Sequence, residues 1–119
     1  MSAPLFNQPI AEITVEELAR LQQESPEAVQ FVDVREPQEL ELASLPGFEN
    51  LPLSEYAEWS ADIHARLDAE KQTVVLCHHG MRSAQMCQWL VTQGFTNVKN
   101  IVGGIDAYSS KVDASVPRY

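Results

Sequence analysis

Basic side chains are scarce in this chain. Of its 119 residues, 8 are Lys or Arg and 17 are Asp or Glu, which gives a formal net charge of −9. A strongly acidic protein is repelled by the phosphate backbone of nucleic acids and by anionic lipid headgroups. We therefore expect no nucleic-acid partner and no membrane partner.

Cysteines and long apolar stretches are also few. Cys77 and Cys87 are too few for the disulfide framework of a small secreted domain, and they do not form the paired Cys-x-x-Cys of structural zinc sites. No stretch approaches the roughly 20 apolar residues that cross a bilayer, and the first residues lack the pattern of a secretory signal. These absences predict a cytoplasmic protein with reduced thiols.

The length and the 45% hydrophobic fraction fit one globular domain with one core. We assign residues 1–12 to an N-terminal extension and residues 13–119 to the domain. Apolar runs at 29–34, 73–76 and 98–102 predict strands. Helices are predicted at about 15–23, 37–43, 54–67 and 83–93 and around residue 107. This alternation predicts an α/β fold whose parallel sheet has helices on both faces.

Residues 77–83, with the sequence CHHGMRS, connect the apolar strand 73–76 to a helix. A tight loop that enters a helix points its N–H groups towards its own centre, and the helix dipole adds positive charge there. Gly80 permits unusual backbone angles, and Arg82 adds a fixed positive charge. We predict that these groups keep Cys77 as an exposed, nucleophilic thiolate, although a cysteine at a strand end is more often an inert apolar residue.

Four separated segments, which together extend over residues 13–109, resemble the rhodanese family of single-domain sulfurtransferases. They are the loop CHHGMRS, the strand and turn FVDVREPQEL, the connector LPGFENLPL and the turn IVGGIDAY. The resemblance implies a central parallel five-stranded sheet flanked by helices on both faces. It also implies that Cys77 takes a sulfane sulfur from a donor as a persulfide and passes it to an acceptor. No metal and no organic cofactor are implied.

The resemblance also identifies the residues around Cys77. It implies a substrate-binding loop made of His78, His79, Gly80, Met81, Arg82 and Ser83, with Asp33 and Arg35 beside it as supporting groups. Considered without the family, Asp33 and Arg35 are interpreted as a surface ion pair. Ser83 either donates its hydroxyl to the sulfur or caps the following helix.

Other polar residues have simpler interpretations. Because neighbouring side chains diverge, Cys77 with His78 and His79 is a poor metal site, and the two histidines are interpreted as rim residues. Cys87 shares a helix face with apolar residues and is predicted to be a core thiol. The glutamates of residues 36–41 are interpreted as a solvated helix face.

The expected donor is thiosulfate or a persulfide, either a small molecule or a protein, and the expected acceptor is cyanide or a thiol. Because Arg82 is the only fixed positive charge of the loop, a thiol or protein persulfide is favoured over a small dianion. The alternative is a sulfur-carrier or regulatory binding module without turnover. A phosphatase is disfavoured, because Cys77 and Arg82 are separated by four residues, one fewer than in the loop that encircles a phosphate.

Overall fold

A five-stranded, fully parallel sheet organises the chain, with the strand order β1-β5-β4-β2-β3. The structure, a computed structural model, describes residues 9–119. The strands are β1 (Ala11–Ile13), β2 (Val29–Asp33), β3 (Glu49–Asn50), β4 (Gln72–Leu76) and β5 (Val98–Ile101). This sheet confirms the fold class. Two residues of the expected N-terminal extension, Ala11 and Glu12, pair in β1, and residues 1–8 of that extension lie outside the described residues.

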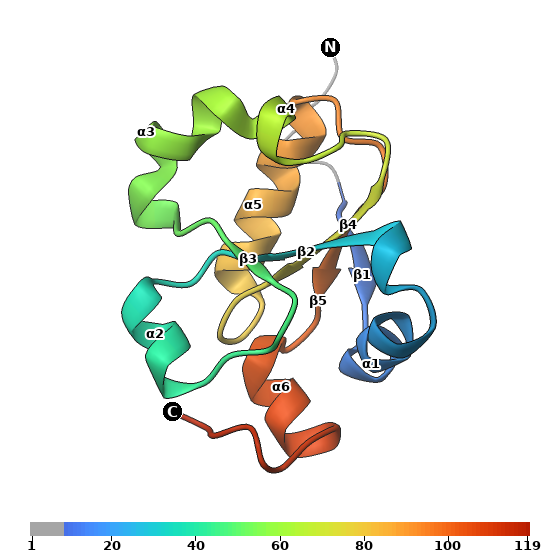
Figure 1. The fold of residues 1–119 in the computed structure, drawn as a ribbon, viewed down its shortest axis with the longest axis vertical. Helices are drawn as coiled ribbons and strands as arrows, with labels where there is room; N and C mark the ends of the chain where they lie inside the picture. Colours follow the sequence, from blue (N-terminus) through green and yellow to red (C-terminus); the bar gives the residue numbers. More distant parts are fainter. Residues whose placement is uncertain (1–8) are drawn as a thin grey trace.

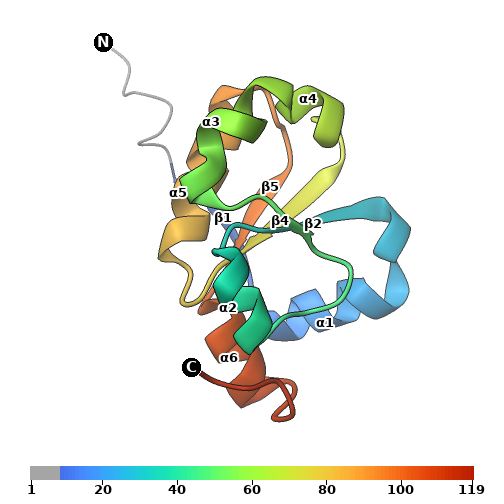
Figure 2. The same ribbon diagram turned by 60° about the vertical axis from the view of Figure 1, so that its left-hand side comes forward.

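Helices cover both faces of the sheet. The longer helices are α1 (Val15–Glu24), α2 (Pro37–Leu42), α5 (Met81–Thr92) and α6 (Gly104–Lys111), and a 3-10 turn, η2 (Pro26–Ala28), precedes β2. Figures 1 and 2 show α5 on one side of the sheet and α1 with α6 on the other. In both views α2, α6 and the C-terminal segment lie together at one end of the molecule.

Side-chain alternation along β4 divides the core into two layers. Val75 and Cys77 belong to the apolar cluster under α5, whereas Val74 and Leu76 belong to the cluster under α1 and α6. Successive side chains of a strand point to opposite faces, so a central strand covered on both sides is apolar throughout. This alternation fixes Cys77 on the α5 side of the sheet.

The predicted helix at 54–67 is wrong as one continuous element. The segment consists of η3 (Leu53–Glu55), α3 (Tyr56–Trp59), η4 (Ser60–Asp62) and α4 (Ile63–Arg66). Ser60 and Asp62 are poor helix formers because their side chains compete for nearby backbone groups. The apolar spacing nevertheless identifies buried residues, since Trp59, Ile63 and Leu67 all lie in the core.

The start of α1 follows the sequence closely. The Thr14 hydroxyl accepts a hydrogen bond from the Glu17 N–H, and the Glu17 carboxylate accepts one from the Thr14 N–H, which forms a capping box.

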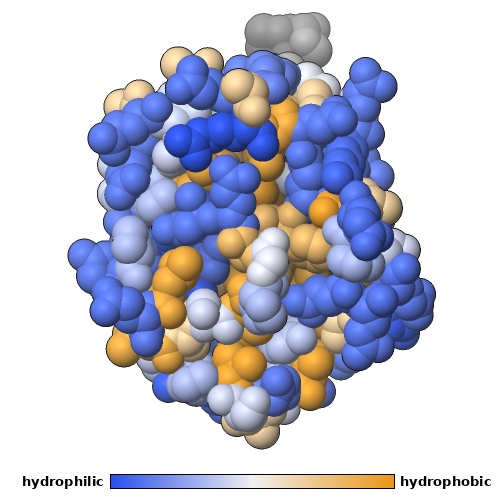
Figure 3. Space-filling view, in the orientation of Figure 1, coloured by the Kyte–Doolittle hydropathy of each residue, from blue (hydrophilic) through white to orange (hydrophobic). Residues whose placement is uncertain are grey.

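Within residues 9–119, no helix has the length and apolar character needed to cross a bilayer. Hydrophilic residues cover much of the face seen in Figure 3, and hydrophobic residues show between them near its centre. The cytoplasmic location stays a prediction.

Candidate active site

Three loops meet at the carboxyl ends of β2, β4 and β5, where ligands of parallel α/β sheets gather. Residues 33–35 run from the last residue of β2 into the following loop, residues 77–80 connect β4 to α5, and residues 102–103 connect β5 to α6. The predicted site residues therefore converge on one end of the sheet, although they come from separate parts of the sequence.

Among residues 9–119, two groups make polar contacts with the sulfur atom of Cys77. The Gly80 N–H donates to Sγ over 3.0 Å, and Ser83 Oγ lies 3.2 Å from Sγ. Ser83 Oγ also donates to Asn100 Oδ1, while Asn100 Nδ2 donates to the Gly80 carbonyl over 3.0 Å. The single hydroxyl hydrogen of Ser83 can serve either acceptor, so it can turn to the sulfur when that atom becomes an anion.

Cys77 is not exposed, and in this respect the expectation is wrong. Only 1% of the residue is accessible, because the alternation along β4 directs its side chain into the layer beneath α5. The polar contacts with Gly80 and Ser83 distinguish it from an inert core cysteine. Any molecule that reacts with Sγ therefore needs a rearrangement of the surrounding side chains to reach it.

Cys87 lies in the same apolar layer and is fully buried, as predicted. Burial raises the pKa of its thiol to about 12. A thiol with so high a pKa is a neutral, weak nucleophile at neutral pH. The two cysteines of this chain therefore differ in surroundings: one has polar partners and the other has an apolar environment.

Gly80 shapes the entry to α5. Its φ of 106° lies in the left-handed region, which confirms the predicted need for glycine. The helix begins at Met81; the N–H groups of its first turn have no partner within the helix, and no side chain of the described residues caps them. Ser83 lies inside α5 and contacts the sulfur, so its predicted alternative role as a cap is wrong.

The N-terminus of α6 binds the loop after β4 through two backbone hydrogen bonds. The Ile105 N–H donates to the Cys77 carbonyl over 2.9 Å, and the Asp106 N–H donates to the His78 carbonyl over 3.1 Å. Gly104 has a φ of 60°, and a Cβ atom there would lie 2.4 Å from both carbonyl oxygens. Gly104 is thus required for this close approach and is not merely a turn signal.

Arg82 points to a carboxylate rather than to the centre of the loop. Its Nη1 lies 2.7 Å from Glu39 Oε2, and its Nη2 lies 2.9 Å from Glu39 Oε1. These bonds lower the pKa of Glu39 to about 2, and Glu39 in turn raises the pKa of Arg82. The interpretation of Glu39 as part of a solvated face is wrong, because the strand ends bring α2 against the start of α5.

Asp33 and Arg35 form a buried ion pair, so the surface interpretation is wrong. Both residues are almost completely buried, and Arg35 donates from its backbone N, Nε and Nη2 to the Asp33 carboxylate. Arg35 Nη1 donates to the Tyr119 hydroxyl, which donates to Glu39 Oε1. The pair therefore supports the Arg82 contact through a chain of hydrogen bonds, as expected of groups beside the loop.

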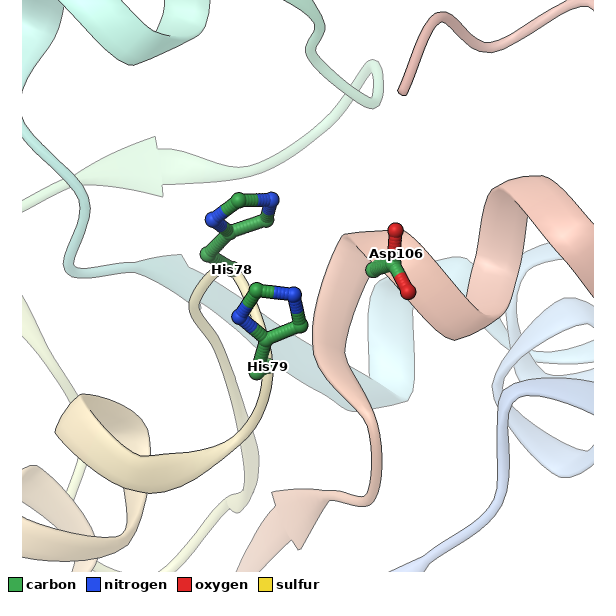
Figure 4. A group of neighbouring side chains, drawn as sticks. All are labelled: His78, His79 and Asp106. Atoms are coloured by element: carbon green, nitrogen blue, oxygen red, sulfur yellow. The ribbon is translucent and has the colours of Figure 1, made fainter. Parts of the chain in front are cut away.

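The two histidines of the loop converge instead of diverging. Their ring centroids are 3.9 Å apart, and the ring of Tyr119 stacks on His78 at 3.9 Å and 6°. Figure 4 shows both imidazoles on the side of the loop that faces Asp106. Met81 is 80% exposed, so it does not enclose the site.

Several residues of the site escaped sequence reasoning. Asn100 could have been found from the sequence, because it is a polar residue within an apolar, buried strand. A polar side chain in a protein core requires a hydrogen-bonding partner. No sequence pattern indicates a site role for Glu39, Asp106 or Tyr119, because exposed helices and chain ends are rich in such residues. Only the tertiary arrangement brings them to the loop.

Comparison with known proteins identifies the family. Residues 14–111 match the family described as "Rhodanese: Rhodanese-like domain". The chain belongs to the rhodanese-like domain family. This rhodanese-like chain is 50% identical over 114 residues to Rhodanese-like/PpiC domain-containing protein 12, chloroplastic, of Arabidopsis thaliana, which covers 94% of the chain and 38% of that protein.

A second relative is Adenylyltransferase and sulfurtransferase MOCS3-2 of Zea mays, 34% identical over 112 residues, with 92% of the rhodanese-like chain and 23% of the relative covered. The chain thus spans well under half the length of these two relatives.

Solved structures have the same fold. A rhodanese-like domain protein from Staphylococcus aureus has a TM-score of 0.73 at 25% identity, covering 92% of this chain and 99% of that one. The human single-domain sulfurtransferase TSTD1 has a TM-score of 0.71 at 25% identity, covering 87% of this chain and 98% of that one. The rhodanese-like chain is therefore related to sulfurtransferases.

Proposed function

We propose that this rhodanese-like domain is a sulfurtransferase in which Cys77 carries a sulfane sulfur as a persulfide. The supporting observation is the position of Sγ, which accepts a hydrogen bond from the Gly80 N–H beside the uncapped first turn of α5. Backbone N–H groups and the helix dipole stabilise negative charge at this position. They stabilise the terminal sulfur anion of a Cys77 persulfide.

The reaction has two balanced halves. The Cys77 thiolate attacks the terminal sulfur of a donor persulfide, a new S–S bond forms, and the donor S–S bond breaks with its electron pair leaving on the donor thiolate. With thiosulfate, sulfite leaves instead. An acceptor thiolate, or cyanide, then attacks the terminal sulfur of the Cys77 persulfide, and Cys77 leaves as a thiolate. No external oxidant or reductant is needed, and the kinetics are ping-pong.

The contact between Arg82 and Glu39 favours one class of donor. Two guanidinium nitrogens already bind a carboxylate, so most of the positive charge that would attract a dianion is neutralised. The persulfide group carries one negative charge, whereas thiosulfate carries two, so a persulfide depends less on a free cation. We therefore propose that thiol persulfides, free or on a protein, react faster than thiosulfate.

Mass spectrometry of the intact protein tests the proposed function. After incubation with glutathione persulfide or thiosulfate, we expect the mass to increase by one sulfur atom and to return to its original value when a thiol or cyanide is added. Cys77→Ser should take up no sulfur. Cys87→Ser is the matched control, because its thiol is buried among apolar residues, and it should load like the parent protein.

Two results would overturn the proposal. If neither donor gave a sulfur adduct, the proposed sulfurtransferase activity would be refuted. An adduct that forms on Cys77 but is not discharged by any thiol or by cyanide would instead favour the binding module without turnover.

A further inference from the structure

We propose that His78, His79 and Asp106 form a binding site for a divalent transition-metal ion of the Zn²⁺ class. One potential ligand atom from each residue lies within 4.8 Å of the other two. The histidines belong to the loop after β4, and Asp106 belongs to the first turn of α6. Neutral imidazole nitrogens and a carboxylate oxygen are common zinc ligands. This proposal does not depend on the sulfurtransferase reaction.

An unsatisfied atom of His78 points to a ligand at this position. His78 Nε2 is buried and has no hydrogen-bond partner among the described residues. Figure 4 shows that the ring nitrogen farther from the main chain faces the Asp106 side in both histidines. A buried polar atom without a partner is costly, and it requires an explanation in a native structure. Coordination of a metal ion satisfies this nitrogen.

The backbone already holds the three residues together. The Asp106 N–H donates to the His78 carbonyl over 3.1 Å, which fixes the start of α6 against the loop. Tyr119 stacks on the face of His78 at 3.9 Å and limits rotation of that ring. Tetrahedral zinc with ligands at about 2.1 Å separates its ligand atoms by about 3.4 Å. Because the two imidazoles are stacked with 29° between their planes, the exposed His79 ring must rotate out of this stack for both nitrogens to reach one ion, while Tyr119 keeps the His78 ring in place.

One competing group must be displaced. Arg118 Nε and Nη2 lie 3.0 and 3.2 Å from the two carboxylate oxygens of Asp106. The Arg118 side chain is 60% exposed, and exposed ion pairs contribute little free energy. A divalent ion held by two imidazoles replaces such a partner readily. Three protein ligands leave a fourth position open for water or a small thiolate.

Calorimetric titration of the metal-free protein with Zn²⁺ at neutral pH tests the site. We expect one ion per chain, and His79→Ala and Asp106→Asn should each weaken binding at least ten-fold. Arg118→Gln should strengthen binding several-fold, because it removes the competitor. His64→Ala is the matched control, since His64 is the only other histidine of the chain, and it should bind like the parent.

The titration is repeated on Cys77→Ser to separate this site from zinc binding by the nucleophilic thiol. Binding that survives in Cys77→Ser and is lost in Asp106→Asn supports the proposal. Binding that is lost in Cys77→Ser, or is unchanged in both His79→Ala and Asp106→Asn, would overturn it, as would no binding. In the NMR spectrum, Zn²⁺ should shift the imidazole signals of His78 and His79 and leave those of His64 in place. None of these readouts requires sulfur transfer, so failure of either proposal is recognised separately.

Discussion

Replacing Glu39 by glutamine should make the protein a better acceptor of sulfur from thiosulfate. The substitution keeps the shape of the side chain but removes the charge that neutralises Arg82, whose two terminal nitrogens both bind the carboxylate. Arg82 lies close enough to Cys77 for the two charges to interact. A freed guanidinium then attracts a dianion towards the sulfur.

The pKa of Glu39 gives the size of the effect. Its contacts, of which the Arg82 hydrogen bonds are the largest, lower this pKa from 4.5 to about 2. At about 1.4 kcal/mol per pKa unit, the whole set of contacts corresponds to about 3 kcal/mol. Because the Arg82 side chain is 36% exposed, solvent screening reduces its share to about 1–2 kcal/mol. A change of this size predicts a rate constant about ten-fold higher for thiosulfate.

The assay compares two donors in each protein. The second-order rate constant of Cys77 persulfide formation is measured with thiosulfate and with 2-hydroxyethyl persulfide, whose only charge is on the persulfide. In Glu39→Gln, the ratio of the thiosulfate rate to the persulfide rate should rise about ten-fold. Glu41→Gln is the matched control, because it removes the same charge from an exposed position of the same helix. An unchanged or lower ratio in Glu39→Gln, or an equal rise in Glu41→Gln, would refute the reasoning.

Three further predictions concern stability, measured by urea unfolding. Gly104→Ala should cost about 1–3 kcal/mol more than Gly94→Ala, because both positions have positive φ but only the first places a Cβ atom 2.4 Å from carbonyl oxygens. Equal losses of unfolding free energy in Gly104→Ala and Gly94→Ala would contradict the steric argument. Asp33→Asn should cost about 3–5 kcal/mol, since it leaves a buried guanidinium without its partner. By contrast, Glu49→Gln at an exposed ion pair should cost about 0.5 kcal/mol or less, and similar costs for the two would contradict the burial argument. Finally, the lowered pKa of Glu39 means that the unfolded chain binds the extra proton, so its stabilisation is complete above pH 4.5 and is lost as the pH falls to about 2. Glu39→Gln should therefore flatten the acid branch of the stability curve, and an unaltered branch would contradict the assignment.

The arrangement of the sheet could be predicted because its signals are local. Apolar runs identify β2, β4 and β5, and the capping box at Thr14 and Glu17 marks the start of α1. Gly80 was identified because glycine permits backbone angles that a Cβ atom resists in a tight turn between a strand and a helix, and its φ is indeed positive. The segment 54–67 was predicted less well, because apolar spacing reports which residues are buried and not whether the helix between them is continuous.

The charged part of the site could not be predicted, because it depends on contacts between distant segments. Glu39 and Arg82 are 43 residues apart in the sequence, and Tyr119 reaches Arg35 over 84 residues. The burial of Cys77 follows from the position of α5, which no local pattern shows. The convergence of His78 and His79 likewise requires the Tyr119 ring and the start of α6 as neighbours.

The most direct test of the central claim is the amide spectrum of the loop before and after sulfur loading. A uniformly ¹⁵N-labelled sample is recorded with Cys77 as a thiol and again after reaction with a persulfide donor. If the loop N–H groups stabilise a sulfur anion, the amide protons of residues 79–83 should move downfield, that of Gly80 among them, and should return when a thiol acceptor is added. Loading that leaves these signals in place, or that moves only the signals around Cys87, would contradict the account.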